Sequence, residues 1–375
     1  MSSSTKEAIT FQDPVTKRQV HQLTNADLRS VHAYYDNPPW SPVNKRIAFS
    51  RLAPLATEGE VFVMDVDGDN LEKLASSNAM TSNDGAMVQW SADGDRVYYK
   101  ARDNGTRLIA WSDVQTGESG SYPGDLRMIC PTGNRQAYHT NCGDFPDHEI
   151  ILKRAEHGLY VQDLDTGKSE LIVTVADCLD IHPRKEEIQN WHLFIKHSKW
   201  SPDGMRMMFV FTNEIRYCDK YAELPRVKDV HVINADRTGL KRVGEFGNHP
   251  IWHPNGQEIL TNSSFQGRRG NSLVLTDVET GEQRLASDAM AGSGHPSFSP
   301  DGRRIALDYV LAKEGYGSLN LIDVGTGIVE HLVQPRITDH SHVGTHMHPV
   351  WSRDGRQLMY ASDATGTAQL CVLDV

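Results

Sequence analysis

The sequence predicts an all-β fold, a seven-bladed β-propeller of four-stranded antiparallel blades in which residues 1–375 form one domain. Three observations predict it. One hairpin motif repeats seven times, a second hairpin motif alternates with it, and the two ends of the chain complement each other. Propellers bury their strand edges by repeating such units around a ring, so this pattern is typical of them.

The first motif is an aromatic residue followed by Ser, Pro, Asp and Gly, and then by a strand of alternating apolar residues. Pro-Asp-Gly and Asn-Gly are tight-turn sequences, and alternation with period two is the pattern of a strand. Each copy therefore predicts a strand, a tight turn and a second strand. Clear copies occupy residues 38–50, 88–100, 198–211, 250–262, 296–308 and 349–362, and a degenerate copy occupies 128–140.

The second motif is an apolar strand that ends in Asp, followed by a short turn and another strand. Copies lie at residues 61–74, 159–172, 273–286 and 319–332, and at 230–243 with Asn in place of Asp. Two hairpins per unit give a four-stranded blade of about fifty residues. No helical periodicity separates the strands, which excludes a parallel α/β fold.

The ends of the chain predict how the ring closes. Residues 368–375 form the third strand of the last blade, and no fourth strand follows them. Residues 9–23 contain a strand after a turn of the same kind and provide the missing outer piece. We expect the N-terminal strand to complete the last blade and to cover its open edge.

Composition limits the partners and the compartment. A formal net charge of −11 argues against nucleic acid or an anionic membrane as the main partner. The sequence has no long apolar stretch and no apolar signal core at its start. Its five cysteines are odd in number and share no paired spacing, as expected of reduced thiols. We therefore expect a cytoplasmic protein, a monomer or dimer, without a nucleic-acid or membrane partner.

Four histidines share one offset in the first motif, three residues before its aromatic residue: His197, His249, His295 and His348. In a ring of repeats, equal offsets fall at equivalent places, so these four imidazoles are expected to converge. Such a histidine cluster indicates a metal site or an acid–base site.

The segment HSHVGTHMHP adds further imidazoles at His340, His342 and His346, just before His348. In a strand, His346 and His348 point the same way, and His295 of the neighbouring blade supplies a third ligand. Imidazole-rich sites suit Zn, Mn, Fe, Ni or Cu, and three such ligands leave positions open for water or substrate. A solvated or pH-sensitive loop is the alternative interpretation.

Irregular stretches at residues 177–197 and 212–229 interrupt the repeat around the fourth blade. Long loops on a regular scaffold often carry function. They can wall a cleft and offer ligand-binding side chains, or be surface excursions without a ligand. The candidates are Arg216, Tyr217, Tyr221, Arg226 and Lys228.

The segments NHPIWHPNG, GHPSFSPDG and THMHPVWSRDG resemble those of oligogalacturonate lyases (polysaccharide lyase family 22), most strongly from about residue 190 onward. Those enzymes are seven-bladed propellers that cleave short pectic oligosaccharides by β-elimination with a Mn ion. The resemblance implies that His295, His346 and His348 bind the metal and that His249 is the catalytic base.

The sequence departs from the family at two positions. The family's glutamine ligand falls on Val343, and the adjacent His342 is its candidate replacement. The family's catalytic arginine falls near Asp229, where Arg226 is the candidate catalytic residue and Lys228 a candidate for binding the substrate. His197 competes with His249 for the role of base, or binds the sugar. These departures favour a relative with an altered substrate preference.

The predicted function is a metal-dependent lyase that cleaves 4-linked uronic-acid oligosaccharides by β-elimination to 4,5-unsaturated products. The cofactor is a divalent transition metal, Mn first, with Zn or another ion as alternatives, and the partner is an acidic oligosaccharide. No G-x-S-x-G motif for a serine hydrolase is present. A TolB-like non-enzymatic binding module, and a lyase or hydrolase for another uronate glycan, are the alternatives.

Overall fold

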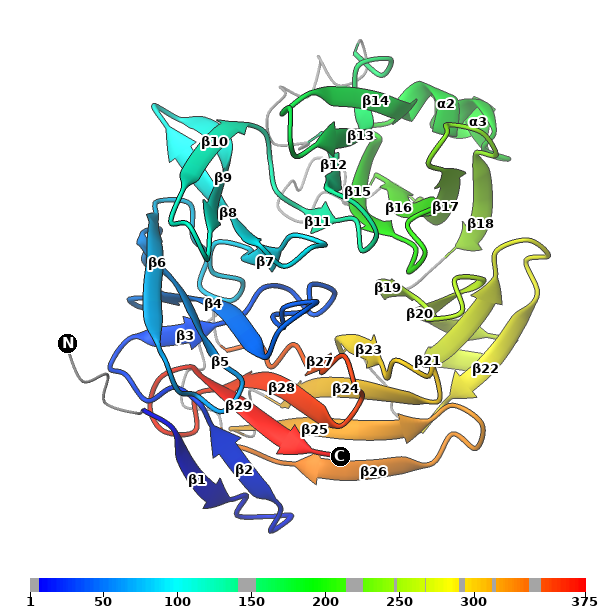
Figure 1. Cartoon of the computed structure of the whole chain (residues 1–375). Helices are drawn as coiled ribbons and strands as arrows, with labels where there is room; N and C mark the ends of the chain where they lie inside the picture. Colours follow the sequence, from blue (N-terminus) through cyan, green and yellow to red (C-terminus); the bar gives the residue numbers. More distant parts are fainter. Residues whose placement is uncertain are drawn as a thin grey trace. The chain divides into compact units, whose positions relative to one another are not determined.

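The protein is a seven-bladed β-propeller, as the sequence predicts (Figure 1). The computed structural model describes residues 7–140, 153–213, 225–245, 248–266, 268–289, 294–311, 315–336 and 345–375. The chain divides into two compact units, Met1–Leu126 with Gly292–Val375, and Arg127–Ala291. We call them unit 1 and unit 2. In the described part of the chain, no helix is long and apolar enough to cross a membrane.

Unit 1 contains the first, second, sixth and seventh blades, and each is an antiparallel sheet. The first blade is β3 (Arg29–Val31), β4 (Arg46–Leu52), β5 (Gly59–Asp65) and β6 (Glu72–Ser77), and the second is β7 (Gln89–Trp90), β8 (Arg96–Asp103), β9 (Thr106–Asp113) and β10 (Ser119–Pro123). The sixth is β23 (Pro296–Phe298), β24 (Arg304–Leu311), β25 (Tyr316–Asp323) and β26 (Val329–Val333). The seventh joins β27 (Val350–Trp351), β28 (Gln357–Ser362) and β29 (Gln369–Asp374) to β2 (Gln19–Gln22) and β1 (Ile9–Gln12).

Unit 2 contains the third, fourth and fifth blades. The third is β11 (Met128–Ile129), β12 (Arg135–His139), β13 (Gly158–Asp163) and β14 (Ser169–Thr174), so the degenerate copy of the motif does form a hairpin. The fourth is β15 (Phe194–Trp200), β16 (Arg206–Thr212), β17 (Lys228–Asn234) and β18 (Lys241–Glu245). The fifth is β19 (Asn248–Trp252), β20 (Glu258–Phe265), β21 (Arg268–Asp277) and β22 (Gln283–Ser287).

Hydrogen bonds within the repeated turn explain why the motif uses Ser, Asp and Gly. In the sixth blade, Ser299 Oγ donates to Asp301 Oδ1 at 2.6 Å and accepts from the backbone N–H of Arg304 at 3.0 Å. Gly302 has a φ of 73°, a left-handed conformation that glycine adopts without steric cost. The same Ser–Asp bond recurs at Ser91, Ser201 and Ser352.

An arginine of one blade secures the motif of the next blade within each unit. In unit 2, the Arg135 guanidinium lies 4.6 Å from the ring centroid of Trp200 and donates to the carbonyl of Gly204. In unit 1, Arg304 makes the equivalent pair of contacts with Trp351 and Gly355. Each arginine thus combines a cation–π contact with a hydrogen bond across a blade boundary.

The N-terminal segment completes the last blade, as predicted, and also adds a fifth strand to it. β2 pairs with β29, and β1 pairs with β2 as an extra outer strand. Figure 1 shows this dark blue hairpin beside the red β29. Thr16 Oγ1 donates to the carbonyl of Leu332 at 2.8 Å, and the N–H of Gln334 donates to Asp13 Oδ2 at 3.0 Å. The hairpin therefore binds both the seventh and the sixth blade.

Deleting residues 1–23 should make the protein insoluble, because it exposes the edge of β29, whose residues Leu370–Leu373 are buried. The soluble fraction after expression and the melting temperature measure the effect. Deleting only residues 1–6, which precede β1, is the matched control. Normal solubility of the longer deletion would refute this account of the closure.

The insertion before the fourth blade is partly helical, which the sequence analysis treated only as an irregular stretch. It forms α2 (Val175–Asp180) and α3 (Lys185–Ile188). Thr174 and Asp177 make a capping box, in which each side chain accepts the other residue's backbone N–H. Val175, Cys178 and Leu179 are buried in the core of unit 2. These helices are too short to produce a periodic pattern of apolar residues that could be recognised in the sequence.

A buried histidine in β17 predicts a loss of stability in acid. His231 lies against the rings of Phe209 and Phe211, and burial lowers its pKa from 6.5 to about 4. Between these two values the unfolded chain binds a proton that the folded chain excludes, so the free energy of unfolding falls as the pH falls. The effect of this one group reaches about 3 kcal/mol.

Replacing His231 with Phe, which the aromatic surroundings accommodate, should remove this contribution. Denaturant unfolding at about pH 7 and about pH 4.5 is the measurement. The His231→Phe variant should lose less stability than the wild type between the two conditions, and an equal loss in both proteins would contradict the assignment.

Candidate metal centre

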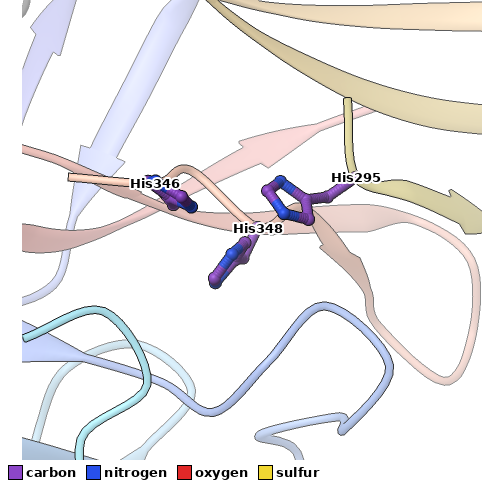
Figure 2. Close-up of side chains that lie close together, drawn as sticks. All are labelled: His295, His346 and His348. Carbon is purple, nitrogen blue, oxygen red and sulfur yellow. The ribbon is translucent and has the colours of Figure 1, made fainter. Parts of the chain in front are cut away.

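Three of the four predicted metal ligands, His295, His346 and His348, come together in unit 1 (Figure 2). One ring nitrogen from each lies within 4.8 Å of the others. The ring centroid of His295 is 4.3 Å from that of His348 and 5.4 Å from that of His346, and the latter two are 5.3 Å apart. His348 is buried, while His295 and His346 are partly exposed. We call these residues the histidine trio.

The reason given for the convergence of His346 and His348 is wrong, although they do converge. They precede β27 and are not part of a strand, so alternation along a strand does not align them. His348 instead has a φ of 48°, in the left-handed region. That region is uncommon for non-glycine residues but favoured severalfold by histidine. The kink redirects the side chain before β27 begins.

The same backbone conformation recurs at the shared offset in other blades. His197, His249 and Met87 have φ values of 55°, 46° and 54°, each three residues before the motif tryptophan. The strand pairing shifts register around His197 and around His249, as at a β-bulge. Bulges redirect side chains and are common next to functional sites. In these blades the position three residues before the tryptophan therefore shares a backbone conformation as well as a place in the sequence motif.

A buried carboxylate that the sequence analysis missed contacts two members of the trio. Asp308, in β24, is only 1% exposed. It accepts hydrogen bonds from the His295 ring, the His295 backbone N–H and the His348 backbone N–H. Burial by itself raises the pKa of this carboxyl, but the adjacent His295 imidazole and these hydrogen bonds outweigh burial and lower the pKa to about 2. Asp308 is therefore ionised at neutral pH.

Two tyrosines, also missed from the sequence, line the trio from the segment between β3 and β4. The ring of Tyr34 lies 4.8 Å from that of His348 and 5.5 Å from that of His295. The ring of the buried Tyr35 lies 5.3 Å from that of His295. These rings place apolar surface against the imidazoles, and their phenol groups are able to form hydrogen bonds.

His32 and Asp84 lie behind His348. The ring of His32 is 6.5 Å from that of His348, and burial lowers the pKa of His32 to about 4, so its imidazole stays neutral. Asp84 Oδ1 is 3.6 Å from His348 Nδ1. His348 is thus close to a carboxylate as well as to the other two histidines of the trio.

The residues present fit a divalent transition metal. Three imidazoles that each offer one ring nitrogen are a common donor set for Zn, Mn or Fe. A carboxylate that holds one of them from behind is the usual second partner of a metal-binding histidine. Among the described residues, the trio is the one group of three or more His, Cys, Asp or Glu side chains whose ligand atoms lie close enough together to hold an ion.

The predicted catalytic histidines, His249 and His197, lie in unit 2, so their convergence with the trio remains a prediction. His249 is partly buried in β19, and His197 lies in β15. Burial, and then the nearby cations Lys199 and Arg127, lower the pKa of His197 well below its usual range. His197 is therefore a neutral imidazole at neutral pH.

The region of the predicted catalytic arginine is organised around Asp229. This buried carboxylate accepts two hydrogen bonds from Arg242 and lies 2.7 Å from His182 Nε2. Arg242 was missed because it lies on the next strand, β18, where only the pairing of β17 with β18 brings it near. The Arg226 carbonyl accepts from Arg184, and Lys228 begins β17.

Four further candidates lie outside the described residues. They are His342, the candidate replacement for the family's glutamine, and the loop residues Arg216, Tyr217 and Tyr221.

Comparison with known proteins supports the propeller in two ways. The TolB beta propeller domain family matches residues 240–375. A TolB homologue of Chlorobium luteolum is 31% identical over 127 residues, which are 34% of this chain and 26% of that protein. The uncharacterized peptidase YuxL of Bacillus subtilis is 25% identical over 169 residues, which are 45% of this chain and 22% of that protein. The chain thus spans about a quarter of the length of these two relatives.

Solved structures of oligogalacturonate lyases match nearly the whole chain. One, in complex with manganese, has a TM-score of 0.73 at 19% identity and covers 98% of this chain and 96% of its own. Another, from Vibrio parahaemolyticus, has a TM-score of 0.72 at 18% identity and covers 99% and 97%. The fold is that of oligogalacturonate lyases. The resemblance predicted from the sequence is confirmed at this level.

Proposed function

We propose that the protein is a metal-dependent lyase that cleaves 4-linked uronic-acid oligosaccharides by β-elimination, giving 4,5-unsaturated products. The observation that carries the proposal is the histidine trio, which lies within a fold shared with a manganese-bound oligogalacturonate lyase. A binding module has no need of three converging imidazoles supported by a buried carboxylate.

His295, His346 and His348 would hold the ion, and manganese is the first candidate because the similar solved structure contains it. When bound, a divalent cation offsets the negative charge of the substrate carboxylate, which otherwise makes the adjacent C5 proton difficult to remove. The chain itself has a formal net charge of −11, so an acidic sugar needs such local positive charge. Arg226 and Lys228 are candidates to add to it.

His249 would take the proton from C5. A neutral imidazole has the right basicity for this step near neutral pH. The C5–H electrons form the C4=C5 double bond as the C4–O4 bond breaks, and the departing oxygen takes a proton from water. No nucleophile or covalent intermediate is required. His197, Tyr217 and Tyr221 are the alternative bases or sugar-binding groups, and Arg216 is a further sugar-binding candidate.

We further propose a cytoplasmic site of action. Cys130, Cys178 and Cys371 are buried free thiols, which suits a reducing compartment. The substrate would then be a short oligosaccharide rather than a polymer outside the cell.

Incubation with a panel of oligouronides tests the activity. The panel should include oligogalacturonides, glucuronan and ulvan fragments, and rhamnose-capped glucuronate, each with Mn²⁺ present. Elimination creates a conjugated double bond that absorbs in the ultraviolet, and hydrolysis does not. The expected result is a rise in absorbance with at least one substrate. Reducing ends without the chromophore would indicate a hydrolase instead.

A TolB-like binding module is the second candidate, favoured by the family match over residues 240–375 and by the Chlorobium luteolum relative. It predicts that no member of the panel is cleaved and that replacing the trio leaves binding to partner proteins unchanged.

A further inference from the structure

One carboxylate connects metal-ligand candidates of two blades. Asp308 Oδ1 lies 2.6 Å from the His295 backbone nitrogen, and both of its oxygens lie 3.1 Å from His295 Nδ1. Asp308 Oδ2 lies 3.0 Å from the backbone nitrogen of His348. His295 belongs to the sixth blade and His348 to the seventh, so this side chain spans the boundary between them.

These contacts determine which ring nitrogen of His295 is available to a metal. Both oxygens of Asp308 accept a backbone N–H, so the carboxylate acts as the acceptor and Nδ1 of His295 carries the proton that is donated to it. In a neutral imidazole the other nitrogen, Nε2, then has the free lone pair. Nδ1 cannot serve as the ligand atom while it donates this bond.

The position of Asp308 in the repeat indicates that the carboxylate is not a general requirement of the blade. It lies thirteen residues after the histidine of its own motif. The equivalent residues are Val210 in the fourth blade, Asn262 in the fifth and Ala361 in the seventh. Blades with an apolar or amide side chain there still form complete antiparallel sheets, of four strands in the fourth and fifth blades and of five in the seventh. Among the four blades whose motif carries this histidine, only the sixth has a carboxylate at this position, and there it contacts both His295 and His348.

We infer that Asp308 is a positioning residue of the metal centre: it fixes His295 with Nε2 toward the ion and holds the backbone of His348 in register with it. This inference rests on the proposed metal-dependent function. Residues that orient metal-binding histidines in this way typically change metal affinity by about 10- to 100-fold when they are replaced.

Asp308→Asn is the test variant, because it keeps the size of the side chain but removes the charge and one acceptor. Asn262→Ala is the matched control, because Asn262 is equally buried at the same position of the fifth blade, whose histidine is not in the trio. Titration of the metal-free proteins with Mn²⁺, followed by electron paramagnetic resonance, gives each dissociation constant. Circular dichroism and the melting temperature without metal report the fold.

We expect Asp308→Asn to bind Mn²⁺ about 10- to 100-fold more weakly than the wild type, with Asn262→Ala unchanged. Wild-type affinity in a folded Asp308→Asn protein overturns the inference and leaves the proposed function intact. Equal weakening in both variants also overturns it, since the effect would then come from loss of packing. A wild-type protein without affinity for Mn²⁺ overturns the proposed function itself.

A second measurement uses the unaltered chain and holds even where the variant does not fold. Nitrogen-15 spectra of histidine-labelled, metal-free protein distinguish the two neutral tautomers, and His295→Gln identifies the signals of His295. The inference requires the tautomer with the proton on Nδ1. The tautomer with the proton on Nε2 would refute it.

Discussion

Replacing His346 with alanine should remove the bound metal and abolish the lyase activity. His346 contributes one of the three ring nitrogens that lie within 4.8 Å of one another. Loss of even an orienting partner of a ligand typically costs about 10- to 100-fold in metal affinity, so loss of a ligand should cost more. Elemental analysis should find about one ion per wild-type chain and almost none in the variant.

His346 is a better choice than its neighbours in the trio for this experiment. His295 and His348 both donate backbone hydrogen bonds to Asp308, and His348 has a left-handed backbone, so replacing them also disturbs the local structure. His21→Ala, which changes a histidine of the β2 strand, is the control for the loss of any imidazole. Full activity of His346→Ala in the presence of a chelator would show that the reaction needs no metal.

Replacing His249 should leave the metal in place and lower turnover by about two to four orders of magnitude, the usual contribution of a general base. His249 shares the motif offset of His295 and His348 but is not in the trio. Because its φ is 46°, asparagine, which tolerates this conformation, is a cleaner replacement than alanine. Turnover, metal content and melting temperature should be measured together.

The same change at His197 separates the two candidates for the base. His197 also has a left-handed backbone, so His197→Asn is a matched variant. If His197 binds the sugar, its loss should weaken substrate affinity more than turnover. Loss of metal from His249→Asn would instead make His249 a ligand, and the base would have to be sought at His197, Tyr217 or Tyr221.

The fold could be predicted from the sequence because its information is local and repeated. Each copy of the motif contains its own turn, as the Ser299, Asp301 and Gly302 contacts show, and seven copies fix the number of blades. The additional outer strand β1 and the two short helices were not predicted. The strand β1 depends on its pairing with β2, and the helices depend on packing and on the cap at Thr174. None of these elements has a periodic sequence pattern of its own.

The site was predictable only in part, for a related reason. His295 and His348 are visible in the sequence because they share the motif offset, and His346 because it lies in the histidine-rich segment just before His348. Asp308, Tyr34 and Tyr35 instead reach the trio through strand register and through contacts between blades. The sequence does carry one signal for Asp308. It is the carboxylate within the apolar strand that follows GHPSFSPDG, at a position where the other histidine-bearing blades have Val, Asn or Ala.

A left-handed residue lies three positions before four of the motif tryptophans, and this backbone conformation does not depend on which side chain occupies the position. Met87 occupies that position in the second blade with a φ of 54°, close to the values at His197, His249 and His348. The same backbone conformation therefore accommodates a histidine or a methionine without a change in the surrounding strands. A propeller with such positions can acquire or lose a reactive side chain by a single substitution. Related chains can therefore differ in chemistry while their architecture stays constant.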